Sequence, residues 1–157
     1  MLLHETFPVN LIKVDLEAED KEEVFEELVD LFCRSTGNGS REEILSAVRD
    51  RELKMSTGIK KGIALPHGKT NAVDRVYGVI GVSRKGIDYD ALDGEPVYLL
   101  FMMLAPQNDS EKHLRLLKRL AELLDNPSFY DDAIVQKDAQ SVNNIIKKYE
   151  DVLIALD

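Results

Sequence analysis

The sequence predicts a single α/β domain over residues 1–157, with a mixed β-sheet covered by helices on both faces. Three observations support this fold class. A chain of 157 residues fits one domain that buries roughly two-thirds of its unfolded surface. Strand-like and helix-like segments are interspersed along it. One of them, residues 97–104, is apolar throughout, as expected of a strand covered on both faces.

The first part of the chain predicts a strand followed by a helix. Residues 9–16 place Leu, Ile and Val between polar residues, a pattern typical of a half-buried strand. Asp20 then supplies a capping side chain, and Glu23 follows three residues later in a capping-box-like arrangement. Apolar residues recur at helical spacing until Gly-Asn-Gly at residues 37–39 ends the helix.

A second helix and a short strand come next. Ser40 is expected to cap this helix, with Glu43 at its third position, and the apolar stripe continues towards Arg51. Residues 63–65, Ile-Ala-Leu, form a short apolar run, and the proline after them favours an extended conformation. We therefore expect a strand that ends beside the next polar residues.

Two further strands are predicted in the second half. Residues 76–83 are rich in β-branched side chains, and residues 97–104 form the apolar run named above. Residues 86–94 between them contain many turn residues and predict a loop, in which Ile87, Tyr89 and Leu92 are expected to close over the core.

The chain is expected to end in three helices. Ser110 is expected to cap the first, which Asn-Pro at residues 126–127 ends. Residues 129–135 predict a short amphipathic helix. Ser141 is expected to begin the last helix.

Composition narrows the possible partners and the compartment. The net charge of −9 argues against a nucleic acid or an anionic membrane as the main partner. The one cysteine, Cys33, allows no intrachain disulfide, which favours a reducing compartment. No apolar run reaches the roughly 18 residues of a membrane span, and the first residues do not resemble a secretory signal. We therefore expect a cytoplasmic protein.

The most informative stretch is residues 56–69, S-T-G-I-K-K-G-I-A-L-P-H-G-K. His67 follows the strand-like run and Pro66, so its ring is expected to be held in a fixed direction. Gly68 leaves room for close approach of another molecule, and Lys69 adds positive charge. Ser56 and Thr57 offer hydroxyls that could cradle an anion. This set suits a nucleophilic imidazole, whereas the alternative is an ordinary loop histidine beside a turn proline.

This stretch resembles the active-site signature of the EIIA domains of the bacterial sugar phosphotransferase system, in the fructose/mannitol and nitrogen-regulatory branch. The resemblance extends from the helix at Lys21 to the S-V-N-N-I-I-K-K run near the end. It implies a three-layer fold and a phosphoryl group carried by His67, received from the carrier protein HPr. Lys60 stands where the nitrogen-type members have glycine, a departure that could strengthen anion binding.

Two further residues are candidates for the same site. Arg51, within Asp50-Arg51-Glu52, matches an arginine of the family that would hold the phosphate, although it could equally interact with the helix C-terminus or form a surface ion pair. His113 matches a second histidine that assists the first, although it could simply be a hydrated residue in the first turn of a helix.

These residues predict phosphoryl transfer without a cofactor or a metal, because the three histidines and Cys33 lack ligand spacing. Phospho-HPr is the expected donor, and the acceptor is either an EIIB protein of a sugar permease or a regulatory target. The wording of the signature and the absence of a fused EIIB segment favour the regulatory branch. A third hypothesis is a non-catalytic binding module that never takes phosphate.

Overall fold

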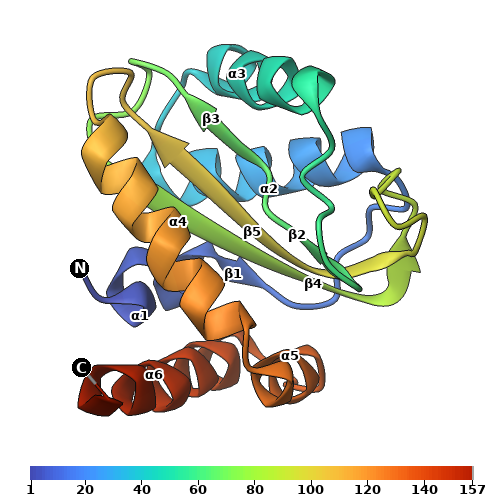
Figure 1. Ribbon diagram of the computed structural model, residues 1–157. Helices are drawn as coiled ribbons and strands as arrows, with labels where there is room; N and C mark the ends of the chain where they lie inside the picture. Colours follow the sequence, from blue (N-terminus) through green and yellow to red (C-terminus); the bar gives the residue numbers. More distant parts are fainter. Residues whose placement is uncertain (157) are drawn as a thin grey trace.

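The computed structural model describes residues 1–156 and shows a β-sheet between two layers of helices (Figure 1). Helices α2 and α3 cover one face, and α1, α4, α5 and α6 cover the other. This arrangement confirms the predicted fold class. The elements in chain order are α1 (Leu3–Thr6), a 3-10 turn η1 (Val9–Leu11), β1 (Ile12–Lys13), α2 (Lys21–Thr36), α3 (Arg41–Lys54), β2 (Ile63–Ala64), β3 (His67–Lys69), β4 (Tyr77–Ile87), β5 (Val97–Ala105), α4 (Ser110–Leu124), α5 (Pro127–Ile134) and α6 (Ala139–Leu156).

The sheet is mixed, with strand order β1-β4-β5-β2, and β3 also pairs with β5. Strands β4 and β5 are antiparallel, whereas β1 is parallel to β4. Strands β2 and β3 lie one after the other along the same side of β5 and are both parallel to it. This register places His67 opposite Met103, at the start of β3.

Strand β5 is the buried centre of the sheet, as its apolar sequence predicts. Alternate side chains point to opposite faces of a strand, so a strand covered on both sides must be apolar at every position. Leu100 and Met102 pack in the core beneath α2 and α3, whereas Phe101 and Met103 pack in the core beneath α4 and α6. All four are at most 1% exposed.

Helix α2 begins and ends as its sequence predicts. The carboxylate of Asp20 accepts a hydrogen bond of 2.9 Å from the backbone N–H of Glu23, which satisfies one of the free donors of the first turn. At the other end, Gly37 adopts φ 75°, and its N–H donates to the carbonyl of Cys33. A left-handed residue at this position closes the helix and is readily supplied by glycine.

The first predicted strand is mostly wrong. Residues 9–16 form the turn η1 and the two-residue strand β1, rather than a continuous strand. Leu11 and Ile12 are buried in different cores, which fits the break between turn and strand. Asp15 then adopts a positive φ of 61°, which interrupts the strand, although the N–H of Leu16 still donates to the carbonyl of Val82 in β4. Helix α1 is not predicted by the sequence pattern.

Several predicted boundaries also change. Strand β4 continues to Ile87, so the predicted loop begins later, and Leu92 is exposed although Ile87 and Tyr89 are buried as expected. Helices α5 and α6 each begin two residues earlier than predicted.

Of the two predicted serine caps, Ser40 is confirmed in position only and Ser110 is wrong. Ser40 occupies the position before α3, but its side chain makes no capping bond. Ser110 is the first residue of α4 rather than its cap, and its hydroxyl accepts a hydrogen bond from Lys69. None of the helices within residues 1–156 combines the length and hydropathy of a membrane span.

The cap of α2 gives a test of the fold. Asp20→Ala should lower the free energy of unfolding by about 1 kcal/mol, because the N–H of Glu23 loses its acceptor. Ser40→Ala is the matched control and should cost much less, because Ser40 makes no capping bond. Urea unfolding of both variants measures the difference, and equal losses would contradict this account of α2.

Candidate active site

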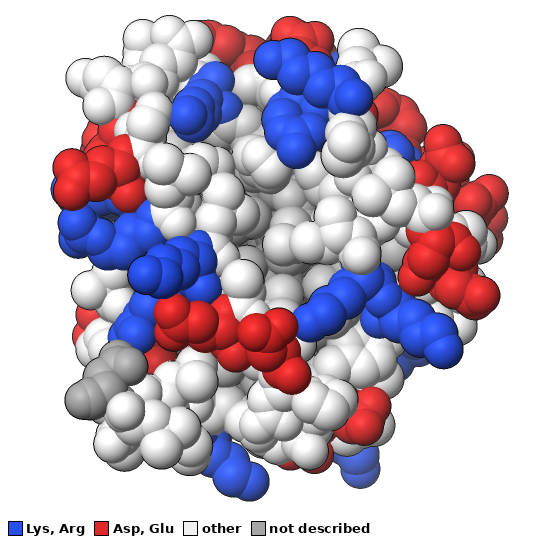
Figure 2. All heavy atoms as spheres, in the orientation of Figure 1, with Lys and Arg blue, Asp and Glu red and all other residues white. Residues whose placement is uncertain are grey.

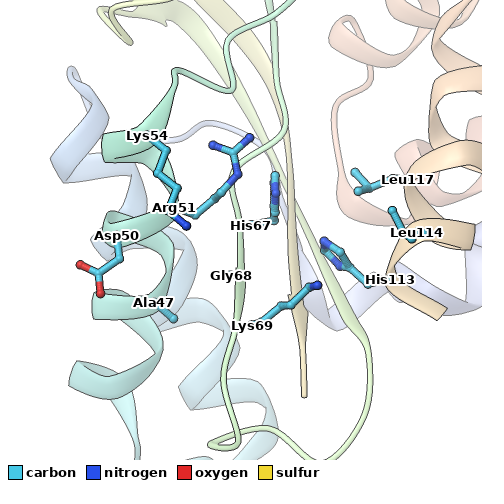
Figure 3. Close-up of a pocket in the computed structure, with 10 residues that line it drawn as sticks. All are labelled: Ala47, Asp50, Arg51, Lys54, His67, Gly68, Lys69, His113, Leu114 and Leu117. Carbon is cyan, nitrogen blue, oxygen red and sulfur yellow. The ribbon is translucent and has the colours of Figure 1, made fainter. Parts of the chain in front are cut away.

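A pocket of about 470 Å³ lies where α3, β3 and α4 meet. In Figure 2, lysine and arginine side chains lie on several sides of an uncharged hollow in this face of the molecule. Figure 3 shows the lining residues at close range, with the ring of His67 between the side chains of Arg51 and His113. Ten residues line the pocket: Ala47, Asp50, Arg51, Lys54, His67, Gly68, Lys69, His113, Leu114 and Leu117.

His67 is held by its own strand and by the preceding residues. Its Nδ1 lies 2.9 Å from the carbonyl oxygen of Leu65. A carbonyl can only accept, so Nδ1 carries the proton and Nε2 keeps its lone pair. The carbonyl of the intervening Pro66 accepts from the N–H of Met103, which fixes this turn of the chain to β5. The expectation that the ring is held in a fixed direction is confirmed.

The surroundings of His67 favour its neutral form. Burial lowers the pKa of His67 below its ordinary value of 6.5, since it disfavours the charged ring. The hydrogen bond to Leu65 opposes this effect, and the positive charges of Arg51 and Lys69 add to it. A ring that is neutral at pH 7 keeps the lone pair that a nucleophile needs.

His113 lies beside His67 with its ring centroid 5.2 Å away. It is in the first turn of α4 and is 3% exposed, and its Nδ1 is the single buried side-chain nitrogen or oxygen without a partner among the described residues. Burial, followed by the neighbouring His67 and Lys69, lowers the pKa of His113 to about 4. The structure thus brings together two histidines that are 46 residues apart in the sequence.

Arg51 supplies a positive charge on the α3 side of the pocket. It lies in the last turn of α3, and its Nη1 donates a 3.0 Å hydrogen bond to the carbonyl of Met55. In Figure 3 its guanidinium lies next to the ring of His67. Lys54 lines the same side. Lys69 is the last residue of β3, and its Nζ donates to the hydroxyl of Ser110 at the start of α4.

The lack of a side chain at Gly68 has a structural role that the sequence did not predict. A Cβ at this position would lie 2.9 Å from the backbone of Ala47 and Val48. The missing side chain therefore allows α3 to pack closely on β3, and this close packing brings Arg51 to His67. The predicted close approach of another molecule stays a prediction, because Gly68 also lines the pocket.

Ser56 and Thr57 lie outside the pocket lining. Thr57 is buried, and its hydroxyl donates a 2.7 Å hydrogen bond to Glu52. The hydroxyl of Ser56 accepts from the N–H of Gly58. The two hydroxyls therefore shape the loop before β2, whereas the sequence predicted that they cradle an anion.

Lys60 is also turned away from His67. Its Nζ donates to the carbonyl of Leu124 and pairs with Asp125, at the far end of α4 from His113. The positive charge therefore lies at a helix C-terminus, where carbonyls lack donors. The expectation that Lys60 adds to anion binding at the site is not supported.

The sequence analysis missed several lining residues. Ala47 and Lys54 lie one helical turn from Arg51, and Leu117 lies one turn after His113, whereas Leu114 is the next residue after His113. Residues three and four apart share a helix face, so this spacing could have identified Ala47, Lys54 and Leu117, but not Leu114, once Arg51 and His113 were chosen.

Sequence comparison identifies the family. The model for the phosphoenolpyruvate-dependent sugar phosphotransferase system EIIA 2 domain matches residues 5–149. The fructose-specific EIIA component of Haloferax volcanii is 33% identical over 139 residues, which cover 88% of this chain and 90% of that protein. The fructose-specific EIIABC component of Bacillus subtilis is 32% identical over 150 residues, which cover 96% of this chain but 24% of that longer protein.

Comparison with solved structures supports the family assignment. The nitrogen regulatory protein IIA-Ntr of Neisseria meningitidis superposes with a TM-score of 0.84 at 31% identity, covering 92% of this chain and 98% of that chain. The mannitol enzyme IIA of Escherichia coli, solved in complex with phosphorylated enzyme IIB, gives a TM-score of 0.76. At 19% identity, over 90% of this chain and 97% of that chain, the second likeness concerns the fold alone.

Fold, family model and relatives together define a phosphoryl-transfer component of the phosphoenolpyruvate-dependent sugar phosphotransferase system. Within that system, the chain belongs to the EIIA 2 family. The resemblance seen in residues 56–69 is therefore confirmed. The names of the relatives include both fructose-specific components and nitrogen regulatory proteins.

The two histidines give a test of the site's electrostatics. In a pH titration followed by NMR, His113 should change its charge near pH 4 and His67 below pH 6.5. Because an unfolded histidine takes up its proton first, the protein should also lose stability as the pH falls from about 6.5 towards 4. A midpoint of 6.5 or higher for His113 would contradict its burial.

Proposed function

We propose that this protein is a phosphoryl relay that accepts a phosphoryl group from phospho-HPr on Nε2 of His67. One observation carries the proposal: the bond from Nδ1 to the carbonyl of Leu65 leaves the Nε2 lone pair available beside a positively charged pocket. A strand and a proline fix the ring, so little freedom is lost when the donor arrives.

The proposed step forms one nitrogen–phosphorus bond and breaks another. The lone pair of Nε2 attacks the phosphorus of the donor's phosphohistidine, and the electron pair of the old bond returns to the donor's ring nitrogen. His67 keeps its Nδ1 proton, so the phosphorylated ring carries a positive charge beside a doubly negative phosphoryl group. The carbonyl of Leu65 faces that proton and stabilises the charged ring.

Positive side chains suit the moving phosphoryl oxygens. Phosphoryl transfer is catalysed mainly by positioning and by charge around those oxygens. Arg51, Lys54 and Lys69 line the pocket, and a guanidinium can donate two parallel hydrogen bonds to phosphate oxygens. His113 stays neutral, so its ring can approach His67 without charge repulsion.

Two kinds of protein are candidates for accepting or sensing the phosphoryl group of His67, and a different observation favours each. A fructose-specific EIIA of 33% identity favours an EIIB protein of a sugar permease. The IIA-Ntr structure, at 31% identity and a TM-score of 0.84, favours a regulatory target whose binding changes with the phosphoryl group. Free Cys33 suits the reducing cytoplasm, which we propose as the compartment for either role.

An acceptor assay separates these roles. Rapid transfer of phosphate from the labelled protein to a fructose-type EIIB would support sugar transport. A stable phosphorylated form with altered binding to a regulatory partner would support regulation. A protein that takes no phosphate would leave the binding-module hypothesis.

The relay itself is tested by labelling. With phosphoenolpyruvate, enzyme I and HPr, the wild type should gain acid-labile phosphate on the peptide containing His67. His67→Gln should fold normally and gain none, because the attacking nitrogen is absent. His4→Gln is the matched control, since His4 lies outside the pocket, and should be labelled normally. Labelling of His67→Gln at the wild-type rate would refute the proposal.

A second variant tests the neighbouring ring. His113→Ala should slow phosphorylation about tenfold without abolishing it, because His67 and Arg51 remain but the pocket loses the ring that packs beside them. Lys112→Ala, one residue earlier and outside the pocket lining, should leave the rate unchanged. Quench-flow labelling measures both rates. Equal rates for His113→Ala and wild type would remove His113 from the site.

A further inference from the structure

A buried carboxylate lies directly behind the site. Glu52 follows Arg51 in the last turn of α3, but it is 8% exposed and does not line the pocket. An ionised carboxylate that leaves water must find donors for both of its oxygens. The donors that surround Glu52 therefore indicate what this buried carboxylate does.

Both oxygens of Glu52 are fully engaged. Oε2 accepts a 2.8 Å bond from the backbone N–H of Thr57 and lies 3.1 Å from Nζ of Lys21. Oε1 accepts a 2.7 Å bond from the hydroxyl of Thr57 and a 3.2 Å bond from that of Tyr89. Burial would raise the pKa of Glu52, yet the bonds from Thr57 and Lys21 outweigh it and hold the pKa below its ordinary value. The carboxylate thus accepts hydrogen bonds from both the backbone N–H and the side-chain hydroxyl of Thr57.

From Thr57, one path of hydrogen bonds leads to His67. The carbonyl of Thr57 accepts a 3.0 Å bond from the N–H of Leu65. The carbonyl of the same Leu65 accepts the bond from Nδ1 of His67. The position of Thr57 therefore helps to set the position of the acceptor that orients the ring.

A second path leads to Arg51. Its guanidinium donates to the carbonyl of Met55, two residues before Thr57. Residues 55–57 are thus bonded to both groups of the site. Met55 accepts the bond from Arg51, and Thr57 is connected to His67 through Leu65. Fixing this segment fixes the guanidinium relative to the imidazole.

We propose that Glu52 is a positioning residue for phosphoryl transfer, which fastens residues 55–57 and thereby aligns Arg51 with His67. It touches neither the phosphoryl group nor the partner. The inference rests on the proposed function in one respect: it takes Nε2 of His67 as the attacking atom.

The test is Glu52→Gln, which keeps the shape of the side chain and removes its charge and one acceptor. The Nδ1-protonated form of His67 should lose population in ¹⁵N NMR spectra. The rate of phosphorylation at saturating phospho-HPr should fall about 10- to 100-fold, because a misplacement of about 1 Å between reacting groups can cost roughly 100-fold. The phospho-HPr concentration at half-maximal rate should stay the same, because the pocket surface is unchanged.

Glu42→Gln is the matched control. Glu42 lies on the same helix, is exposed and pairs with Arg41, so its replacement should leave both the ring and the rate as in wild type. A folded Glu52→Gln variant with wild-type His67 spectra and a wild-type rate would overturn the proposal.

If Glu52→Gln does not fold, Thr57→Val decides the question. It removes one bond to Glu52 and keeps the backbone bond, so it should shift the His67 spectra and slow transfer, whereas Thr57→Ser should restore both. Identical spectra and rates for Val and Ser would overturn the proposal. If wild type takes no phosphate, the proposed function fails, and the His67 spectra alone then decide the role of Glu52.

Discussion

The position of the site depends on the burial of strand β5. This strand pairs with β4 on one side and with β2 and β3 on the other, and helices cover both of its faces. Its register is held by paired backbone hydrogen bonds to the neighbouring strands on both sides and by the close packing of its buried side chains. The pairing of His67 with Met103 is thereby fixed, and the imidazole starts from a rigid part of the molecule.

Rigidity alone does not make a histidine reactive, and the structure adds two electrostatic conditions. The carbonyl of Leu65 selects the ring form in which Nε2 is free. Burial lowers the pKa of both His67 and His113, so two rings can lie side by side without repelling each other. The positive charges that line the pocket come from Arg51 and Lys54 on α3 and from Lys69 on β3.

Local patterns predicted much of this arrangement from the sequence. The apolar run of β5, the cap of Asp20 and the strand-proline-histidine order around His67 each depend on residues close together in the chain. The short β1 was predicted poorly, because the positive φ of Asp15 and the division of Leu11 and Ile12 between two cores arise from tertiary packing. Periodicity in a single segment does not contain that information.

The role of Thr57 shows the same limit within the site. Its hydroxyl lies 2.8 Å from that of Tyr89, a residue 32 positions later in a region predicted as a loop. Only the folded chain brings Glu52, Thr57 and Tyr89 together, so the sequence suggested an anion cradle where the structure has a buried anchor. Lys60 likewise finds its partners at Leu124 and Asp125, 64 and 65 residues away.

The central claim is that Nε2 of His67 is the atom that carries the phosphoryl group. Long-range ¹H–¹⁵N NMR of the phosphorylated protein, with phosphorus coupling, tests it most directly, because the two ring nitrogens give separate signals. The account predicts phosphorus coupled to Nε2, while Nδ1 keeps its proton and its bond to Leu65. Phosphorus on Nδ1, or on any residue other than His67, would contradict it.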